Sequence, residues 1–193
     1  GMKGLRYMQD LMRNQFYKQR SDFELSAIER DKTQVMPEGV SVQTDIPYMN
    51  DGDKAHRMDV YRPEGSESTT LPVVINIHGG GLLIGSKEFN RFFCAKLSRL
   101  GYLVFSIEYR LVPDCMVFDQ FSDVCNAFKY INAHLGEYNG DSNHIYGVAD
   151  SGGAYLLTYT AAMAKNRELA KAAHVKPQKF SFRAIGLISG MFY

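Results

Sequence analysis

The chain has 193 residues, a length that suits one domain with a sizeable hydrophobic core. Hydrophobic residues make up 45% of the chain and charged residues 22%, which is ordinary for a water-soluble globular protein. The formal net charge is only +1, so the chain lacks the strong basic field that attracts nucleic acid, and we expect no nucleic-acid partner.

Local sequence excludes further classes. The longest apolar runs have about eight residues, whereas a membrane-spanning helix needs roughly 20, so we expect no membrane span. The first residues contain no continuous apolar stretch of signal-peptide type, which predicts a cytoplasmic location. Cys94, Cys115 and Cys125 have no metal-ligand spacing and form no C-x-x-C pair, so we expect reduced thiols, no bound metal and no cofactor.

The first part of the chain has a helical pattern. Apolar residues recur at three- and four-residue intervals between residues 3 and 31, which predicts one or two amphipathic helices. The segment "MPEG" at residues 36–39 contains a proline and a glycine, and these residue types punctuate structure. We therefore expect a helical segment over residues 1–38 and a second unit over residues 39–193.

From Val40 onward the pattern becomes that of strands alternating with helices. "VSVQTDIPY" and "HRMDVYRP" alternate apolar and polar residues, as half-buried strands do, and Asp51-Gly52 between them predicts a hairpin turn. Four continuous apolar runs follow, in "LPVVINI", "YLVFSIEYR", "HIYGVAD" and "FRAIGLISGMFY", with helical patterns between them. This β-α-β-α-β-α-β order predicts a mostly parallel sheet of about six strands with helices on both faces.

Two glycine-rich turns come directly after two of the buried strands. The first is His78-Gly79-Gly80-Gly81, and the second is Ala149-Asp150-Ser151-Gly152-Gly153. Ligands of open α/β sheets bind at the carboxyl ends of the strands, where both turns belong. The second turn is similar to a nucleophile elbow, in which a serine sits on a sharp strand-to-helix turn with small neighbours. A flexible turn before a helix would explain this second turn alone, but not both turns together.

These motifs together resemble the α/β-hydrolase fold, in particular the hormone-sensitive-lipase-like branch of esterases and lipases. The matching segments are "HGGGLLIGS" at 78–86, "YRLVPD" at 109–114 and "ADSGGA" at 149–154. The resemblance covers nearly the whole chain and implies a three-layer α/β/α fold. It further implies an enzyme whose substrate is a small-molecule acyl ester. It also implies that the N-terminal helical segment is part of a cap over the acyl pocket.

The resemblance implies specific roles for the motif residues. Ser151 would be the nucleophile, and the backbone N–H groups of Gly80, Gly81 and Gly152 would form the oxyanion hole. His78 would be a structural residue of its loop, and Asp150 would orient loops. In the same way, Tyr109, Arg110 and Asp114 would brace the neighbouring loop.

The family's acid and base are expected after a seventh and an eighth strand, whereas this sequence is predicted to end at about the sixth. The chain has five histidines, which are His56, His78, His134, His144 and His174. His78 lies at the correct edge of the sheet, but its ring is needed for the turn. Three others are expected at the amino-terminal edge, a strand length from Ser151, and His56 precedes an early strand.

Two functions therefore remain open. The chain is either a serine ester hydrolase that is weak or inactive as it stands, or a binding and assembly module that kept the elbow without the triad. A peptidase on the same fold is a less favoured third interpretation. The last strand would be an exposed apolar edge, and such edges pair readily. We therefore expect either that the chain is a fragment of a longer protein or that a second copy covers this edge, in a homodimer or larger assembly.

Overall fold

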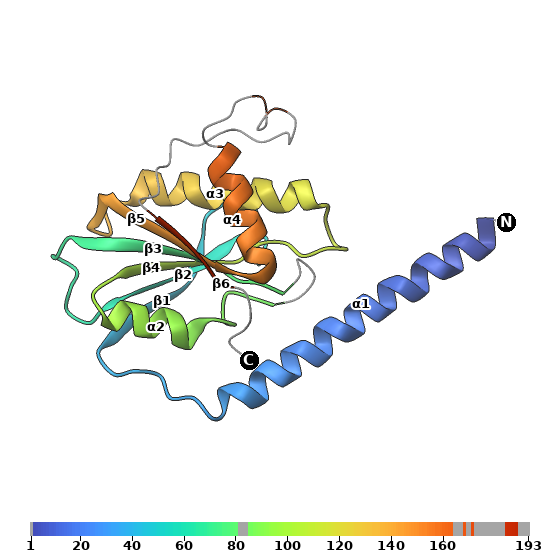
Figure 1. The fold of residues 1–193 in the computed structure, drawn as a ribbon, viewed down its shortest axis with the longest axis horizontal. Coiled ribbons are helices and arrows are strands. Elements are labelled where there is room, and N and C mark those ends of the chain that lie inside the picture. Colours follow the sequence, from blue (N-terminus) through green and yellow to red (C-terminus); the bar gives the residue numbers. More distant parts are fainter. Residues whose placement is uncertain (1, 81–84, 164–167, 169–170, 172–183, 189–193) are drawn as a thin grey trace.

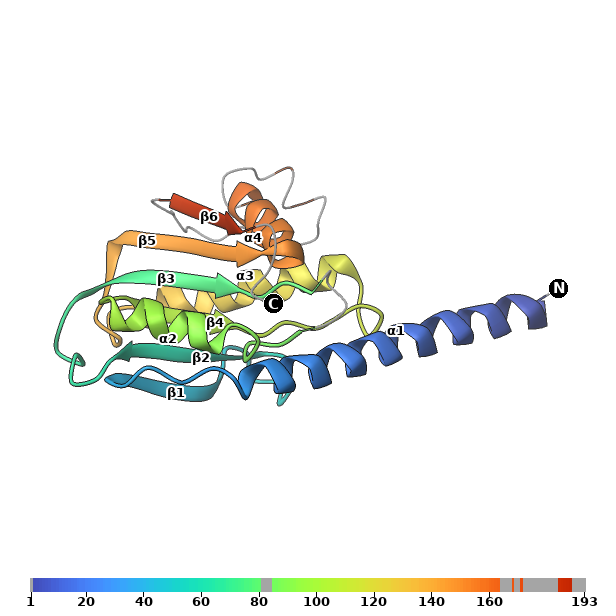
Figure 2. The ribbon, with the colours of Figure 1, turned by 60° about the horizontal axis from the view of Figure 1, so that its bottom comes forward.

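The computed structural model describes residues 2–80, 85–163, 168, 171 and 184–188 of the chain. Its centre is a six-stranded sheet with the strand order β1-β2-β4-β3-β5-β6. Helix α2 (Arg91–Arg99) covers one face of the sheet, and α3 (Val117–His134) and α4 (Ser151–Met163) cover the other (Figures 1 and 2). This confirms the predicted three-layer α/β/α arrangement.

The predicted hairpin is present, and it fixes the direction of the second strand. Strand β1 (Val40–Pro47) pairs antiparallel with β2 (Arg57–Pro63), and β2 pairs antiparallel with β4 (Leu103–Ile107). Strands β3 (Leu71–Ile77), β4, β5 (Gly140–Asp150) and β6 (Ala184–Ile188) are parallel to one another. The start of β2 therefore lies at the same edge as the carboxyl ends of the parallel strands.

Two details of the strands differ from the sequence prediction. Strand β1 is mostly exposed and β2 is buried on both faces, although both were expected to be half-buried. The reason is position, because β2 lies inside the sheet while β1 forms its edge. The polar side chains of β2 are satisfied inside the protein: Asp59 pairs with Lys87 Nζ at 3.0 Å, and Arg62 donates to the Tyr138 carbonyl at 2.9 Å.

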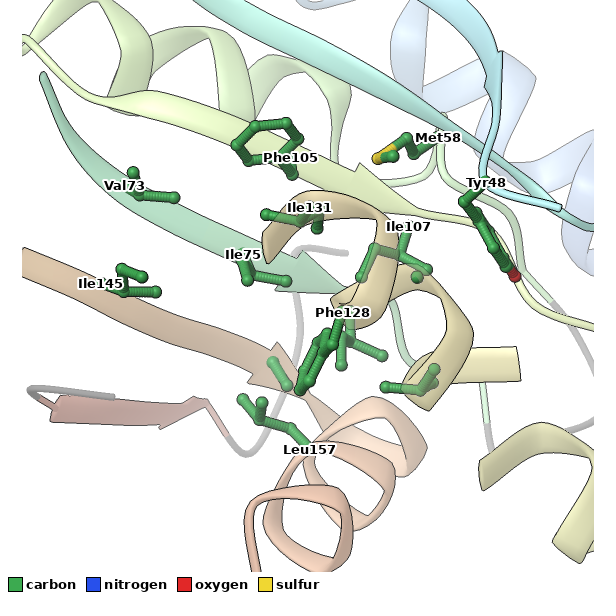
Figure 3. Packing of buried hydrophobic residues seen from close by; sticks show 14 of the residues in the cluster. Tyr48, Met58, Val73, Ile75, Phe105, Ile107, Phe128, Ile131, Ile145 and Leu157 are labelled. Atoms are coloured by element: carbon green, nitrogen blue, oxygen red, sulfur yellow. The ribbon is translucent and has the colours of Figure 1, made fainter. Parts of the chain in front are cut away.

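The main hydrophobic core lies between the sheet and the two helices α3 and α4. Val73, Ile75 and Ile107 from the strands meet Phe128 of α3 and Leu157 of α4 (Figure 3). A smaller cluster around Cys94 and Val104 fills the space under α2. Burial on both faces explains why the parallel strands have continuous apolar sequences rather than alternating ones.

The N-terminal segment forms a single helix, α1 (Met2–Asp31), where the sequence allowed one or two. Its second half contacts the body: Arg20 pairs with Asp114 at 2.9 Å, and the Phe23 ring lies 5.0 Å from the Phe89 ring. Its first half extends away from the sheet, and every described side chain from Lys3 to Gln15 is exposed (Figure 1). A role for α1 as a cap remains a prediction.

Two further expectations concern membranes and cysteines. Within the described residues, no helix combines the length and the apolar character that crossing a bilayer requires. The three cysteines carry free thiols, and burial raises the pKa of the Cys94 thiol to about 12. A thiol held protonated in this way is a poor nucleophile, so Cys94 has a packing role.

Candidate active site

The two glycine-rich turns lie side by side at one edge of the sheet. Strands β3 and β5 are parallel neighbours in which Ile77 is paired with Ala149. His78 and Asp150 follow these paired residues directly, and α4 begins at Ser151. Gly80 has a φ of +122°, which few other residues adopt, whereas Gly81 lies outside the described residues.

Gly153 lets the elbow helix approach the end of β3. A Cβ atom added at Gly153 would lie 2.2 Å from the Ile77 carbonyl oxygen and 2.5 Å from the His78 carbonyl oxygen. Both obstructing atoms belong to the backbone, so no side-chain rotation could relieve the clash. A glycine is therefore required here for close packing between the two turns.

Asp150 connects the two turns through one carboxylate oxygen. Its Oδ1 atom accepts a hydrogen bond from the Gly79 N–H at 3.0 Å and another from Asn90 Nδ2 at 3.0 Å. The Asp150 side chain is almost completely buried, where an unpaired carboxylate would be costly. Asp150 thus holds the His78 turn against the elbow, and Asn90 is a member of this site that no sequence motif indicated.

The His78 ring is engaged within its own loop. The ring is fully buried and stacks on Tyr109, with 4.3 Å between the ring centroids. Its Nδ1 atom lies 2.8 Å from the Gly79 carbonyl oxygen, to which it donates, and Nε2 lies 3.2 Å from Glu108 Oε1 in a geometry too bent for a hydrogen bond. The Tyr109 hydroxyl donates to the His78 carbonyl at 2.6 Å, so Tyr109 holds this turn in place.

Arg110 and Asp114 brace different elements and do not pair with each other. Arg110 forms a bidentate ion pair with Asp123 of α3, in which Nη2 lies 2.8 Å from Oδ1 and Nε lies 3.0 Å from Oδ2. The hydrogen bonds to Asp123 raise the pKa of Arg110 above its ordinary value. Asp114 instead accepts hydrogen bonds from Tyr17 and Arg20 of α1, and these bonds lower the pKa of its carboxyl group.

His56 lies at the carboxyl edge, which the antiparallel direction of β2 explains. Its Nε2 atom is 2.8 Å from Asp123 Oδ1, and its Nδ1 atom is 2.6 Å from Asp51 Oδ2. Strand β2 is three strand spacings from β5, so His56 is about 14 Å to the side of the elbow at roughly 4.8 Å per strand. The ring therefore joins the hairpin turn to α3 and does not reach Ser151.

The remaining histidines are not at the elbow either. His134, at the end of α3, has Nδ1 2.8 Å from the Tyr130 carbonyl, and His144, early in β5, has Nδ1 2.7 Å from Asp141 Oδ2. Both lie toward the amino-terminal edge of the sheet, as expected. His174 lies outside the described residues. Among the histidines that the structure describes, none is placed to act as a base for Ser151.

Two cavities lie between α1 and the loops beside the His78 turn. One has a volume of about 280 Å³ and is lined by Phe23, Ile28 and Phe89, among others. The other has about 560 Å³ and a charged lining that includes Arg20, Glu108 and Arg110. Gly85 and Ser86, at the end of the glycine-rich loop, contribute to both cavities. Over the described residues, no cluster of three or more histidine, cysteine, aspartate or glutamate side chains is arranged to bind a metal.

Comparison with known families agrees with this geometry. The BD-FAE family profile matches residues 58–190, which include both glycine-rich turns. The chain belongs to the BD-FAE family. This assignment supports the resemblance to α/β-hydrolase esterases that the motifs indicated.

Named relatives of this BD-FAE chain are esterases. A probable isoprenylcysteine alpha-carbonyl methylesterase of Oryza sativa subsp. japonica is 29% identical over 136 residues, which is 70% of this chain and 32% of the relative. The probable carboxylic ester hydrolase LipM of Mycobacterium tuberculosis is 31% identical over 123 residues, covering 59% of this chain and 28% of LipM.

The fold is shared with solved esterase structures. Esterase B from Lactobacillus rhamnosis superposes with a TM-score of 0.88 and 26% identity, covering 93% of this chain and 57% of that chain. An esterase from the archaeon Pyrobaculum calidifontis gives a TM-score of 0.67 at 32% identity, covering 79% of this chain and 49% of that chain. The BD-FAE chain thus spans about half the length of these structural relatives and a third or less of the curated relatives described above.

Replacing Gly153 by alanine should disrupt the contact between the two turns. We expect Gly153→Ala to lower the free energy of unfolding by about 3 kcal/mol, the upper end for overpacking, because backbone atoms must move. Gly136→Ala is the matched control, since a Cβ atom there meets nothing within 4 Å. Chemical denaturation would measure both variants, and equal stability of the two would contradict the close approach.

Proposed function

We propose that this chain carries the nucleophile and the oxyanion hole of a carboxylic-ester hydrolase. The observation that carries the proposal is the locked pair of turns, joined by the Asp150–Gly79 hydrogen bond and the close approach at Gly153. Membership of the BD-FAE family and the esterase names of its relatives support it. The substrate class is a small-molecule acyl ester.

In this proposal the reaction proceeds through an acyl-enzyme on Ser151. The serine hydroxyl attacks the ester carbonyl carbon, its proton passes to a base, and the alcohol leaves with a proton. Water then attacks the acyl-enzyme and releases the carboxylic acid. The N–H groups of Gly80, Gly81 and Gly152 stabilise the negative charge that develops on the carbonyl oxygen in both steps.

We expect slow turnover from this chain alone. His78 is occupied within its turn, His56 is about 14 Å to the side of the elbow, and the other described histidines lie toward the opposite edge. A serine hydroxyl without a base is a weak nucleophile near neutral pH. An oxyanion hole alone still gives roughly a thousandfold acceleration over water.

We further propose that α1 forms one wall of the substrate pocket. The two cavities beside the His78 turn are enclosed on one side by α1, which is held there by Arg20 on Asp114 and by Phe23 on Phe89. Together the cavities could accept a small acyl group and a small alcohol. The charged lining of the larger cavity favours a polar group on one side of the ester.

Labelling with a fluorophosphonate probe tests the proposed nucleophile. We expect stoichiometric but slow labelling of the wild-type chain at Ser151, accompanied by weak hydrolysis of p-nitrophenyl acetate. Ser151→Ala should abolish the labelling and leave only the residual hydrolysis that an oxyanion hole alone supports, whereas Ser142→Ala, at the other end of β5, should leave both signals unchanged. Fast turnover that depends on Ser151 would contradict the finding that no described histidine can act as its base, and no labelling would favour a binding or assembly module.

We also propose that two copies associate through β6. This strand is outermost in the described sheet and pairs only with β5 there, so its second edge can accept a further strand. Light scattering across a dilution series should give twice the 21.8 kDa mass of one chain at high concentration. A constant monomer mass up to high concentration would contradict this association.

A further inference from the structure

Asn90 occupies a position where an asparagine would normally cap a helix, but it does not cap α2. It is the residue before Arg91, the first residue of α2, and its side chain forms no capping hydrogen bond to the helix. Asparagine is among the best residues at this position because its side-chain oxygen accepts a backbone N–H of the first turn. The side chain has therefore been diverted to another partner.

That partner is Asp150, the residue before Ser151. Asn90 is 2% exposed, and its Nδ2 atom donates to Asp150 Oδ1 at 3.0 Å. The orientation of the amide follows from the partner, because a carboxylate can only accept. The same Nδ2 atom lies 3.5 Å from Asn76 Oδ1, and Asn76 Nδ2 donates to Ser106 Oγ at 3.2 Å. Asn90 is thus held from the sheet side and reaches toward the active site.

The arrangement leaves a buried acceptor unused. Asn90 Oδ1 has no hydrogen-bond partner among the described residues, although burial makes an unpaired oxygen unfavourable. This unused oxygen is the atom that would accept the capping hydrogen bond, so Asn90 forgoes the cap of α2. What it gains in return is the short hydrogen bond to Asp150, together with a longer one to Asn76.

We propose that Asn90 is a positioning residue for the oxyanion hole, acting through Asp150. The Asp150 oxygen that accepts Asn90 Nδ2 also accepts the Gly79 N–H, so the orientation of this carboxylate sets the position of Gly79. Gly79 directly precedes Gly80, whose N–H belongs to the proposed oxyanion hole. This inference rests on the proposed function for its catalytic consequence, but not for the link from Asn90 to Gly79.

The Asn90 amide also matters electrostatically. Asp150 places a carboxylate next to Ser151, and such a charge opposes the negative charge that develops in the transition state. The two neutral donors, the Gly79 N–H and the Asn90 amide, stabilise the negative charge of Asp150 on the side of these hydrogen bonds. A second carboxylate at position 90 would have the opposite effect, since like charges at close range repel.

Two substitutions at Asn90 separate positioning from simple packing. Asn90→Ala removes the donor, while Asn90→Asp keeps the shape and places another good capping residue before α2, so it should fold. Asn132→Asp, at an exposed position on α3, is the control for an added charge. Each variant is compared with the wild type by thermal unfolding, by amide hydrogen exchange at Gly79 and by the rate of fluorophosphonate labelling from pH 5 to pH 8.

We expect Asn90→Ala to speed exchange at Gly79 by about tenfold and to slow labelling by a similar factor at every pH, the scale of one hydrogen bond to a charged group. Asn90→Asp should be worse than Asn90→Ala at pH 8. At pH 5 it should recover toward the wild type, because two adjacent carboxyl groups then share a proton and one can donate to the other. The control should match the wild type throughout.

The outcomes that would overturn the proposal are distinct from failure of the proposed function. Unchanged exchange at Gly79 in both Asn90 variants would contradict it, as would an Asn90→Asp defect that is the same at every pH. If the wild-type chain is not labelled at Ser151, the esterase proposal fails. Exchange at Gly79 would then still decide whether Asn90 positions this turn.

Discussion

The hydrogen bond from the Gly79 N–H to Asp150 is the interaction on which the proposed site depends. It joins the residue that follows His78 at the end of β3 to the residue that precedes the elbow helix, and the bond is buried. A charged acceptor in a buried environment makes such a bond stronger than one between neutral groups. Strand pairing and the close approach at Gly153 set the two turns side by side, and this hydrogen bond fixes the Gly79 backbone, which a glycine alone restricts little.

Polar groups on one side of the sheet, most of them buried, support the Gly79–Asp150 hydrogen bond. Ser106 bridges Asn76 and the Lys87 carbonyl, while Lys87 Nζ lies 3.0 Å from both Asp45 and Asp59. Burial alone lowers the pKa of Lys87, but its hydrogen bonds to the neighbouring carboxylates raise it above the ordinary value. The Lys87–Asp59 pair is buried whereas Asp45 is exposed, and a buried ion pair by itself is weak evidence for stability. Here these pairs fix the end of the glycine-rich loop, since Lys87 directly follows Ser86.

The sequence was a sound guide to the fold because burial leaves a clear pattern. Continuous apolar runs such as 71–77 and 103–107 are typical of strands covered on both faces, and their order predicts a parallel sheet. The placement of both turns at the carboxyl edge of the sheet followed from the same strand order. The burial of β2 could not be foreseen, because its polar residues are satisfied by partners in distant parts of the chain.

Side-chain relations within the site were less accessible from sequence. Asn90 belongs to no motif, and its role depends on a hydrogen bond to a residue 60 positions away. The location of His56 depends on the direction of β2, which the hairpin fixes only once the sheet order is known. The contact of α1 with Asp114 joins residues 94 positions apart, and no local pattern reports such a pairing.

The most direct test of the locked pair of turns is a crystal structure of the chain after reaction with a phosphonate ester. The account predicts a covalent bond to Ser151, with the phosphoryl oxygen within hydrogen-bond distance of the N–H groups of Gly80 and Gly152 and the Asp150–Gly79 bond intact. An adduct whose oxygen points away from both N–H groups, or a broken Asp150–Gly79 bond, would contradict it.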